Sequence, residues 1–269
     1  MFLKILGDFM GKENYMKYYL NYPIKTSVGV SPYCVRLLEW DDYIKIASRY
    51  LTICEDLIRR RLKLNDEWKL LDYVVLVALN ESNGIENLEK MFSMAFRKPV
   101  KAFIKTRQGN IDLHSTTIVV GDYEIVEGEL VAQHKINRDN YKEIREIMME
   151  QAFLFDPLIG ADERSQNRID RAIQKKIEKA NKNGGNPNIE SMLVLNSSRF
   201  QIDLETYTYY QLKAQYSLLN REQVAMMYNI CRPHGKDIPI INFADELDIH
   251  DNPFSFEKMF RKDNGSVGD

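Results

Sequence analysis

The chain has 269 residues, of which 44% are hydrophobic and 28% are charged. This balance predicts a folded globular protein and excludes the low-hydrophobicity, high-charge composition of a disordered chain. The formal net charge of −2 argues against a surface built as a whole to hold nucleic acid or an acidic membrane. No segment approaches the roughly 18 apolar residues of a membrane span, so no membrane contact is expected.

Three cysteines, at positions 34, 54 and 231, form no paired framework. Such a sparse, odd set predicts reduced thiols in a cytoplasmic protein. The amino-terminal residues also lack the long apolar region and the cleavage site of a secretory signal.

The first two regions are an extended amino-terminal arm, residues 1–36, and a helical region, residues 37–98. Tyrosines cluster in the arm near prolines and a glycine. From Tyr43 to Ile58 apolar side chains recur at three- and four-residue steps, which predicts one amphipathic helix that ends near the basic run at 59–61. A second helix capped at Asn65 or Asp66 should end around 82–84, and a third, short helix should stop before Pro99.

Residues 99–137 are predicted to form a small antiparallel β segment. From Val100 the apolar period shortens to about two, and a β-branched run follows at 116–120. A turn is expected at 108–110, and Gly121 with Asp122 fits a two-residue hairpin loop. Three or four strands are expected between about residues 100 and 136.

Residues 138–260 return to helical spacing, and residues 261–269 should be a flexible tail. Asp139 can cap the first of these helices, a polar surface helix should span 164–182, and the loop 181–188 is a candidate hinge. Asp203 can cap a further helix, with a separate one from Glu222 to Cys231. The predicted fold class is therefore α+β, predominantly α-helical with a small antiparallel β insertion.

Catalytic frames are missing from the sequence. It contains no G-x-S-x-G, G-x-G-x-x-G or G-x-x-x-x-G-K-[ST] pattern. No catalytic residue and no cofactor is therefore predicted, and the chain is not expected to be an enzyme.

A dense acidic cluster near residue 250 is the main candidate for metal chemistry, although no metal ligand is assigned; Cys231 and His234 could supply only half of a zinc site. Its members are Asp245, Glu246, Asp248, His250 and Asp251. Carboxylates with an imidazole could hold a hard divalent cation, which leaves open a metal-dependent hydrolase or nuclease. The alternative is a solvated acidic tail, because the spacing is not that of a calcium-binding loop.

The predicted helix at 164–182 carries basic residues at near-helical spacing. They are Arg164, Arg168, Arg171, Lys175, Lys176, Lys179 and Lys182. Such a row could line phosphates, so a nucleic-acid-binding accessory protein is a further alternative. Interspersed acidic residues favour a charged solvent face instead, and nucleic acid is disfavoured as a partner.

Tyrosines are unusually dense in the arm and in the predicted helix after 203. The candidate interface residues are Tyr18, Tyr19, Tyr22, Tyr207, Tyr209, Tyr210 and Tyr216. Tyrosine is enriched at protein interfaces, yet the same rings could simply pack in a core. Both interpretations stay open at this stage.

Four stretches of the carboxyl-terminal half resemble structural or assembly proteins of large tailed bacteriophages: YKEIREIMMEQAFLFDP, NPNIESMLVL, DLETYTYYQLKAQYSLLNR and FADELDIHDNPF. The segments LLEWDDYIKIASRYL and LDYVVLVALNE resemble baseplate-hub and tail-assembly proteins of contractile-tailed phages. The resemblance implies a non-enzymatic role in building the tail or baseplate. It further implies other phage tail or baseplate proteins as partners, with homo-oligomers allowed, in the host cytoplasm during assembly or in the virion.

Overall fold

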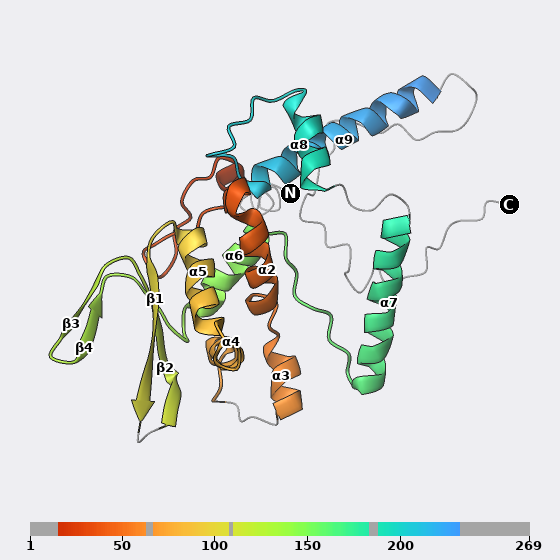
Figure 1. The fold of residues 1–269 in the computed structure, drawn as a ribbon. Helices are drawn as coiled ribbons and strands as arrows, with labels where there is room; N and C mark the ends of the chain where they lie inside the picture. Colours follow the sequence, from red (N-terminus) through yellow and green to blue (C-terminus); the bar gives the residue numbers. More distant parts are fainter. Residues whose placement is uncertain (1–15, 63–66, 108–109, 183–187, 232–269) are drawn as a thin grey trace, which may run out of the picture.

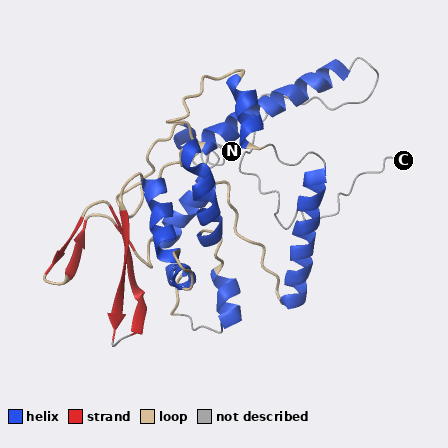
Figure 2. Ribbon diagram, in the orientation of Figure 1, coloured by secondary structure: helices blue, strands red, loops and turns tan. Residues whose placement is uncertain are grey.

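A computed structural model describes residues 16–62, 67–107, 110–182 and 188–231 of the chain. The fold is α+β and mostly helical with small antiparallel sheets, as the sequence predicts. A helical body carries the strands on one side, while the long helix α7 (Glu163–Lys182) stands apart from that body (Figures 1 and 2). No helix in the described ranges is both long and apolar enough to cross a membrane.

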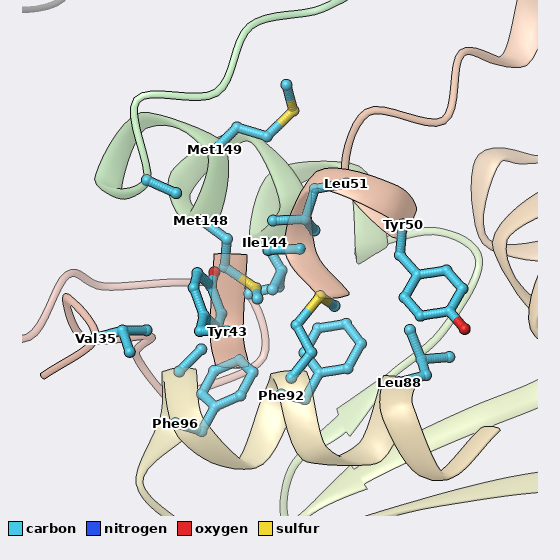
Figure 3. Packing of buried hydrophobic residues seen from close by; sticks show 14 of the residues in the cluster. Val35, Tyr43, Tyr50, Leu51, Leu88, Phe92, Phe96, Ile144, Met148 and Met149 are labelled. Atoms are coloured by element: carbon cyan, nitrogen blue, oxygen red, sulfur yellow. The ribbon is translucent and has the colours of Figure 1, made fainter. Parts of the chain in front are cut away.

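Four helices supply most of the core: α2 (Trp40–Tyr50), α4 (Leu70–Leu79), α5 (Gly84–Phe96) and α6 (Tyr141–Gln151). A short 3-10 helix, η1 (Leu37–Glu39), leads into α2. Figure 3 shows Tyr43 of α2, Phe92 and Phe96 of α5 and Met148 of α6 meeting between these helices. The three- and four-residue spacing of apolar side chains in α2, α5 and α6 explains why each of these helices turns one face inward. Helix α4 is instead buried around its circumference, because Leu71 to Val75 are all inaccessible to solvent.

The helix predicted between Tyr43 and the basic run is two helices, α2 and α3 (Glu55–Leu62). The break follows from the buried Arg145 of α6. Its Nε donates to the carbonyl oxygen of Leu51 at 2.6 Å, and an Nη2 donates to that of Ile53 at 3.5 Å. The guanidinium of Arg145, from a distant helix, thus binds backbone carbonyl oxygens that a continuous helix would use for its own hydrogen bonds. This tertiary contact outweighs the apolar spacing that predicted one helix.

Gly84, placed near the end of the second predicted helix, instead begins α5. A Cβ atom at this position would lie 2.0 Å from the carbonyl oxygen of Ala78, so the close approach of α4 and α5 requires glycine. The predicted caps Asn65 and Asp66 fall outside the described residues, and α4 begins at Leu70.

The strands form two sheets. The larger has the order β1 (Val100–Arg107), β2 (Asn110–Val120), β5 (Lys135–Ile136), and the smaller pairs β3 (Tyr123–Val126) with β4 (Glu129–Ala132). All pairs are antiparallel. Arg107 pairs with Asn110 in the register of β1 and β2, around the expected turn.

The hairpin predicted at Gly121 and Asp122 is wrong. Strand β2 already pairs with β1 on one side and with β5 on the other, which leaves β3 no edge of β2 to join. The backbone N–H of Gly121 donates instead to the carbonyl of Pro99 at 2.8 Å. The hairpin turn lies at Glu127 and Gly128, whose φ angles of 53° and 82° match a type I′ loop between β3 and β4.

The described part of the predicted arm, residues 16–36, packs against the start of α9 (Tyr209–Cys231). A bridge pairs Arg36 with Thr208, and the backbone N–H of Leu37 donates to the carbonyl of Tyr207 at 2.8 Å. Tyr18, Ile24, Cys34 and Tyr210 form a second small apolar cluster at this junction. The arm therefore fastens the carboxyl-terminal helix to the body.

Helix α9 is continuous where two helices were predicted, and it begins at Tyr209. Thr208 and Gln211 form a reciprocal cap: the Gln211 N–H donates to Thr208 Oγ1 at 3.2 Å, and the Thr208 N–H donates to Gln211 Oε1 at 2.9 Å. Asp203, the predicted cap, belongs to the preceding turn. Likewise Asn140, and not Asp139, precedes α6.

The structure also bears on the helix predicted after residue 188 and on the predicted hinge and tail. Helix α8 (Ile189–Ser197) begins after Asn188, whose side chain accepts from the Ser191 N–H at 2.8 Å. The center of the predicted hinge, residues 183–187, and the predicted tail, residues 261–269, lie outside the described residues.

Candidate functional site

A groove of about 710 Å³ runs between the larger sheet and the β3–β4 hairpin. One wall comes from Phe103–Lys105 of β1 and His114–Thr117 of β2, and the other from Ile125 and Gly128–Leu130 of the hairpin. The segment after β5, including Arg138, closes one side. Its volume lies within the range of ligand-binding clefts.

An irregularity in the pairing of β1 and β2 shapes the first wall. Phe103 pairs with Thr117, but Lys105 pairs with Asp112, so β2 has three more residues than β1 between these two pairs. Ser115, within the extra stretch, accepts from the Lys105 N–H at 3.2 Å and donates to the Asp112 carbonyl at 2.7 Å. Bulges of this kind redirect side chains, and here the bulge carries His114.

Asp72, in the first turn of α4, is a buried carboxylate that contacts two side chains of the groove lining, Arg138 and His114. Its carboxylate is fully buried, and Oδ2 accepts from the Lys69 N–H at 2.9 Å and from Arg138 Nε at 3.0 Å. His114 Nδ1 lies 3.1 Å from the same oxygen. Its other oxygen, Oδ1, is buried with no hydrogen-bond partner among the described groups.

This arrangement fixes two basic side chains at the wall of the groove. Arg138 also donates to the carbonyl of Glu67, so its guanidinium is tied at two points. The indole of Trp68 meets the His114 ring edge-on, with ring centroids 5.6 Å apart. A buried ion pair of this kind is weak evidence for stability, but it does hold its partners in one geometry.

The groove walls carry more positive than negative groups. Lys105, Lys135 and Arg138 line it, together with His114, whereas the acidic residues in the lining are Glu129 and Asp139. The Asp139 carboxylate is paired with Lys69, which holds the pKa of that carboxyl below its usual value. Lys135 Nζ donates to the Leu130 carbonyl at 2.6 Å, so this ammonium is held across the groove.

The chemistry open to this site is binding of anionic groups. An imidazole oriented by a carboxylate can also transfer a proton, but that chemistry needs a nucleophile or a substrate proton within reach. The hydroxyl of Ser115, next to His114, is already used within the bulge. Across the described ranges, no group of three or more His, Cys, Asp and Glu side chains is arranged to hold a metal ion.

The hairpin wall is apolar and open to solvent. Every residue of β3 is exposed, including Ile125 at 63%, and Val131 of β4 is exposed at 51%. The ring of Tyr123 meets Phe103 edge-on at 4.9 Å between centroids, which joins the hairpin to the larger sheet. Ile125 pairs with Leu130 on one face of the hairpin, and Val131 pairs with Glu124 on the other, so apolar side chains are exposed on both faces. A two-stranded hairpin of this kind is marginal in water, so these exposed side chains need an explanation.

The tyrosines predicted as an interface divide into three groups. Tyr18, Tyr207 and Tyr210 are buried within the chain, so their rings are not available to a partner. Tyr19, Tyr209 and Tyr216 are half-buried, and Tyr209 stacks on Trp40 with ring centroids 3.7 Å apart. Tyr22 is 59% exposed and is the most open of the seven.

Burial also sets the ionisation of the inner tyrosines. Desolvation raises the pKa of Tyr18 above its usual value of 10.0, and the hydrogen bond from its hydroxyl to Glu150 Oε2 at 2.7 Å adds to the shift. Burial raises the pKa of Tyr207 and of Tyr209 in the same direction. These side chains are neutral structural groups at ordinary pH.

The other predicted sites remain predictions. The acidic cluster from Asp245 to Asp251 lies outside the described residues. Helix α7 forms, and its basic side chains Arg164, Arg168 and Arg171 are exposed on a helix that also displays Asp170 and Glu178. Both a solvated face and a phosphate-binding row are compatible with that arrangement.

Sequence reasoning did not identify Asp72, His114 and Arg138. A signal was present at Asp72, because it is the single charge in the apolar run from Leu70 to Leu79. A carboxylate in such a run is buried when the helix forms and requires a basic partner. The partners come from β2 and from the segment after β5, and nothing local in the sequence reveals them.

Comparisons with protein-family models, with curated proteins and with solved structures find no match to this chain. The site is therefore interpreted from its own geometry.

Proposed function

We propose that this chain is a non-enzymatic assembly protein that binds another protein through its β3–β4 hairpin, in the tail or baseplate of a tailed bacteriophage. The observation that carries the binding role is the hairpin itself, whose apolar side chains face solvent on a ribbon of two strands. The phage setting comes from the resemblance of the carboxyl-terminal half to structural or assembly proteins of large tailed bacteriophages. The tail or baseplate setting comes from the resemblance of two amino-terminal helical segments to baseplate-hub and tail-assembly proteins.

The position of the hairpin supports a role in contact. It lies at the outer side of the larger sheet, away from the helical body (Figure 1). Within the described chain each of its two strands has one neighbour only, so each keeps an edge whose backbone groups can pair with another strand. Exposed apolar side chains beside open strand edges are typical of surfaces that another polypeptide covers.

The experiment places a photo-crosslinking amino acid at position 125 and expresses the chain during infection by its source phage. We expect crosslinks to a tail or baseplate component, and we expect the chain in purified tails or tail-assembly intermediates by mass spectrometry. The double variant Ile125→Ser, Val131→Ser should lose this association while it keeps its fold. The matched control Leu38→Ser removes an exposed apolar side chain at another surface and should retain it.

A chain that stays monomeric and uncrosslinked throughout infection would overturn the proposal. So would co-purification with tail or baseplate components that is unchanged both in the Ile125→Ser, Val131→Ser variant and in a deletion of residues 123–132, because the contact would then not involve the hairpin surface.

A further inference from the structure

We infer that the groove beside the hairpin binds an extended, acidic segment of the partner polypeptide. This inference rests on the proposed function and adds to it the chemistry of the segment that is recognised. It is carried by the basic side chains that the groove holds in fixed positions and by the apolar wall opposite them.

The basic wall is organised before any ligand arrives. Arg138 is fixed by Asp72 Oδ2 and by the Glu67 carbonyl, and Lys135 is fixed by the Leu130 carbonyl. Side chains that are already ordered lose little conformational freedom on binding. The buried Asp72 carboxylate offsets part of the charge of Arg138. Lys105 of β1, opposite the bulge of β2, is exposed and adds a third positive group to the same groove.

The opposite wall is apolar apart from the exposed carboxylate of Glu129. Ile125 and Leu130 from the hairpin line it, and Phe103 from β1 lies at the junction of the two sheets. An extended polypeptide directs successive side chains to opposite sides. A segment that alternates acidic and apolar residues can therefore place carboxylates toward Lys105 and Arg138 and apolar side chains toward Ile125.

The charge of the hairpin favours polypeptide over nucleic acid. Glu124, Glu127 and Glu129 all lie on the hairpin and are exposed. A phosphate backbone presents negative charge at every nucleotide and would be repelled along this outer wall. A polypeptide can keep its carboxylates on one side, facing the basic wall, and so avoid that repulsion.

The test measures binding of a fluorescent, acetylated and amidated peptide, ELDVELDV, to the full-length chain by anisotropy. The comparison peptide carries Gln for Glu and Asn for Asp, and a 20-nucleotide oligo-dT tests for nucleic acid. We expect binding of the acidic peptide that weakens with added salt and drops at least tenfold in Lys105→Glu. The matched control Lys142→Glu changes an exposed lysine of α6 and should bind as the unchanged chain does.

Lys105→Glu removes an exposed side chain, so we expect it to keep the fold, and its urea midpoint checks this. Equal binding of the neutral peptide, no binding of the acidic peptide, or acidic binding unchanged in Lys105→Glu would each overturn the inference. Binding of oligo-dT that is lost in Lys105→Glu would overturn it in favour of nucleic acid.

The two proposals fail in different ways. If Lys105→Glu still co-purifies with the tail or baseplate component in infected cells and the Ile125→Ser, Val131→Ser variant does not, the hairpin function stands and the acidic-segment inference falls. If the peptide binds as expected but no crosslink forms during infection, the groove chemistry stands and the assembly role falls.

Discussion

The chain buries the aromatic side chains around the start of α9, whereas it leaves apolar side chains of the β3–β4 hairpin exposed to solvent. Tyr207 and Tyr210, which the sequence marks as interface candidates, are both buried, Tyr207 in the main core and Tyr210 against the amino-terminal arm. Ile125 and Val131, which the sequence marks only as strand residues, face solvent. The difference shows that a high density of aromatic residues does not reveal a surface, because what covers a side chain depends on segments far away in the sequence.

The largest expected effect comes from removing a buried ring at the α9 junction. Tyr210→Ala deletes a ring that stacks on Phe153, with centroids 5.0 Å apart, and contacts Tyr18. Deletion of a buried aromatic side chain costs about 3–5 kcal/mol, so we expect a loss of that size in the free energy of unfolding from urea titration. Tyr22→Ala, at an exposed ring, is the control and should change it by less than about 0.5 kcal/mol. Equal losses in the two variants would contradict the assignment of Tyr210 to the core.

Alkaline pH should also destabilise the fold through its buried tyrosines. Tyr18 and Tyr43 have a pKa raised above 10.0 by burial, so the folded state favours their neutral forms. This contribution is fully present below pH 10 and is lost as pH rises toward the folded pKa, by up to about 1.4 kcal/mol per group and pH unit. Phenolate absorbance at 295 nm, followed together with circular dichroism, should show these groups ionising as the chain unfolds.

The control for this titration is Tyr18→Phe, which keeps the ring and removes the ionising hydroxyl. Its stability should fall less steeply above pH 10 than that of the unchanged chain. An identical pH dependence in the two proteins would show that Tyr18 does not contribute.

A smaller effect is expected at the hairpin turn. Glu127 adopts a φ of 53°, a conformation that costs most residues about 1 kcal/mol, while Asn followed by glycine is the preferred type I′ pair. Glu127→Asn should therefore stabilise the hairpin locally by about 0.5–1 kcal/mol. Slower hydrogen exchange of amides in 123–132, with unchanged exchange in α5, is the expected measurement. Faster exchange in 123–132 would contradict the assigned turn.

The smallest effect on stability is expected from exposed apolar side chains on the two faces of the hairpin. Ile125→Ser with Val131→Ser removes side chains that the folded chain does not cover. The free energy of unfolding should therefore change by no more than about 0.5 kcal/mol, because substitutions at exposed positions rarely do more. A loss of several kcal/mol in urea titration would show that the chain itself buries these side chains.

Periodicity predicted the elements that carry their own signal. The apolar spacing of α5 and the β-branched run in β2 were visible in the sequence. The spacing of α5 records which face turns inward, whereas the continuous run in β2 is typical of a strand buried on both faces, as Ile118, Val119 and Val120 are. The break after α2 was not visible, since it depends on Arg145, which lies more than ninety positions farther along the chain. The type I′ turn was missed because the glycine at 121 offered a competing local signal.

The candidate site was predictable only at one point. Asp72 is recognisable in the sequence as a charged residue within an apolar helix. The bulge that carries His114 and the position of Arg138 arise from strand pairing, which the sequence does not reveal. The groove has two walls because β3 and β4 leave the larger sheet, and that departure depends on the short strand β5 occupying the second edge of β2.

The pairing of Arg36 with Thr208 has a consequence for how the chain is made. These residues lie 172 positions apart in the sequence. At about 5–20 residues per second, a ribosome needs on the order of 10–35 s to synthesise the intervening stretch. Through that interval the apolar side of the arm has no α9 to cover it. Its burial is therefore among the last steps of folding, and a truncated product that ends before residue 207 would keep Tyr18 and Ile24 without their covering helix.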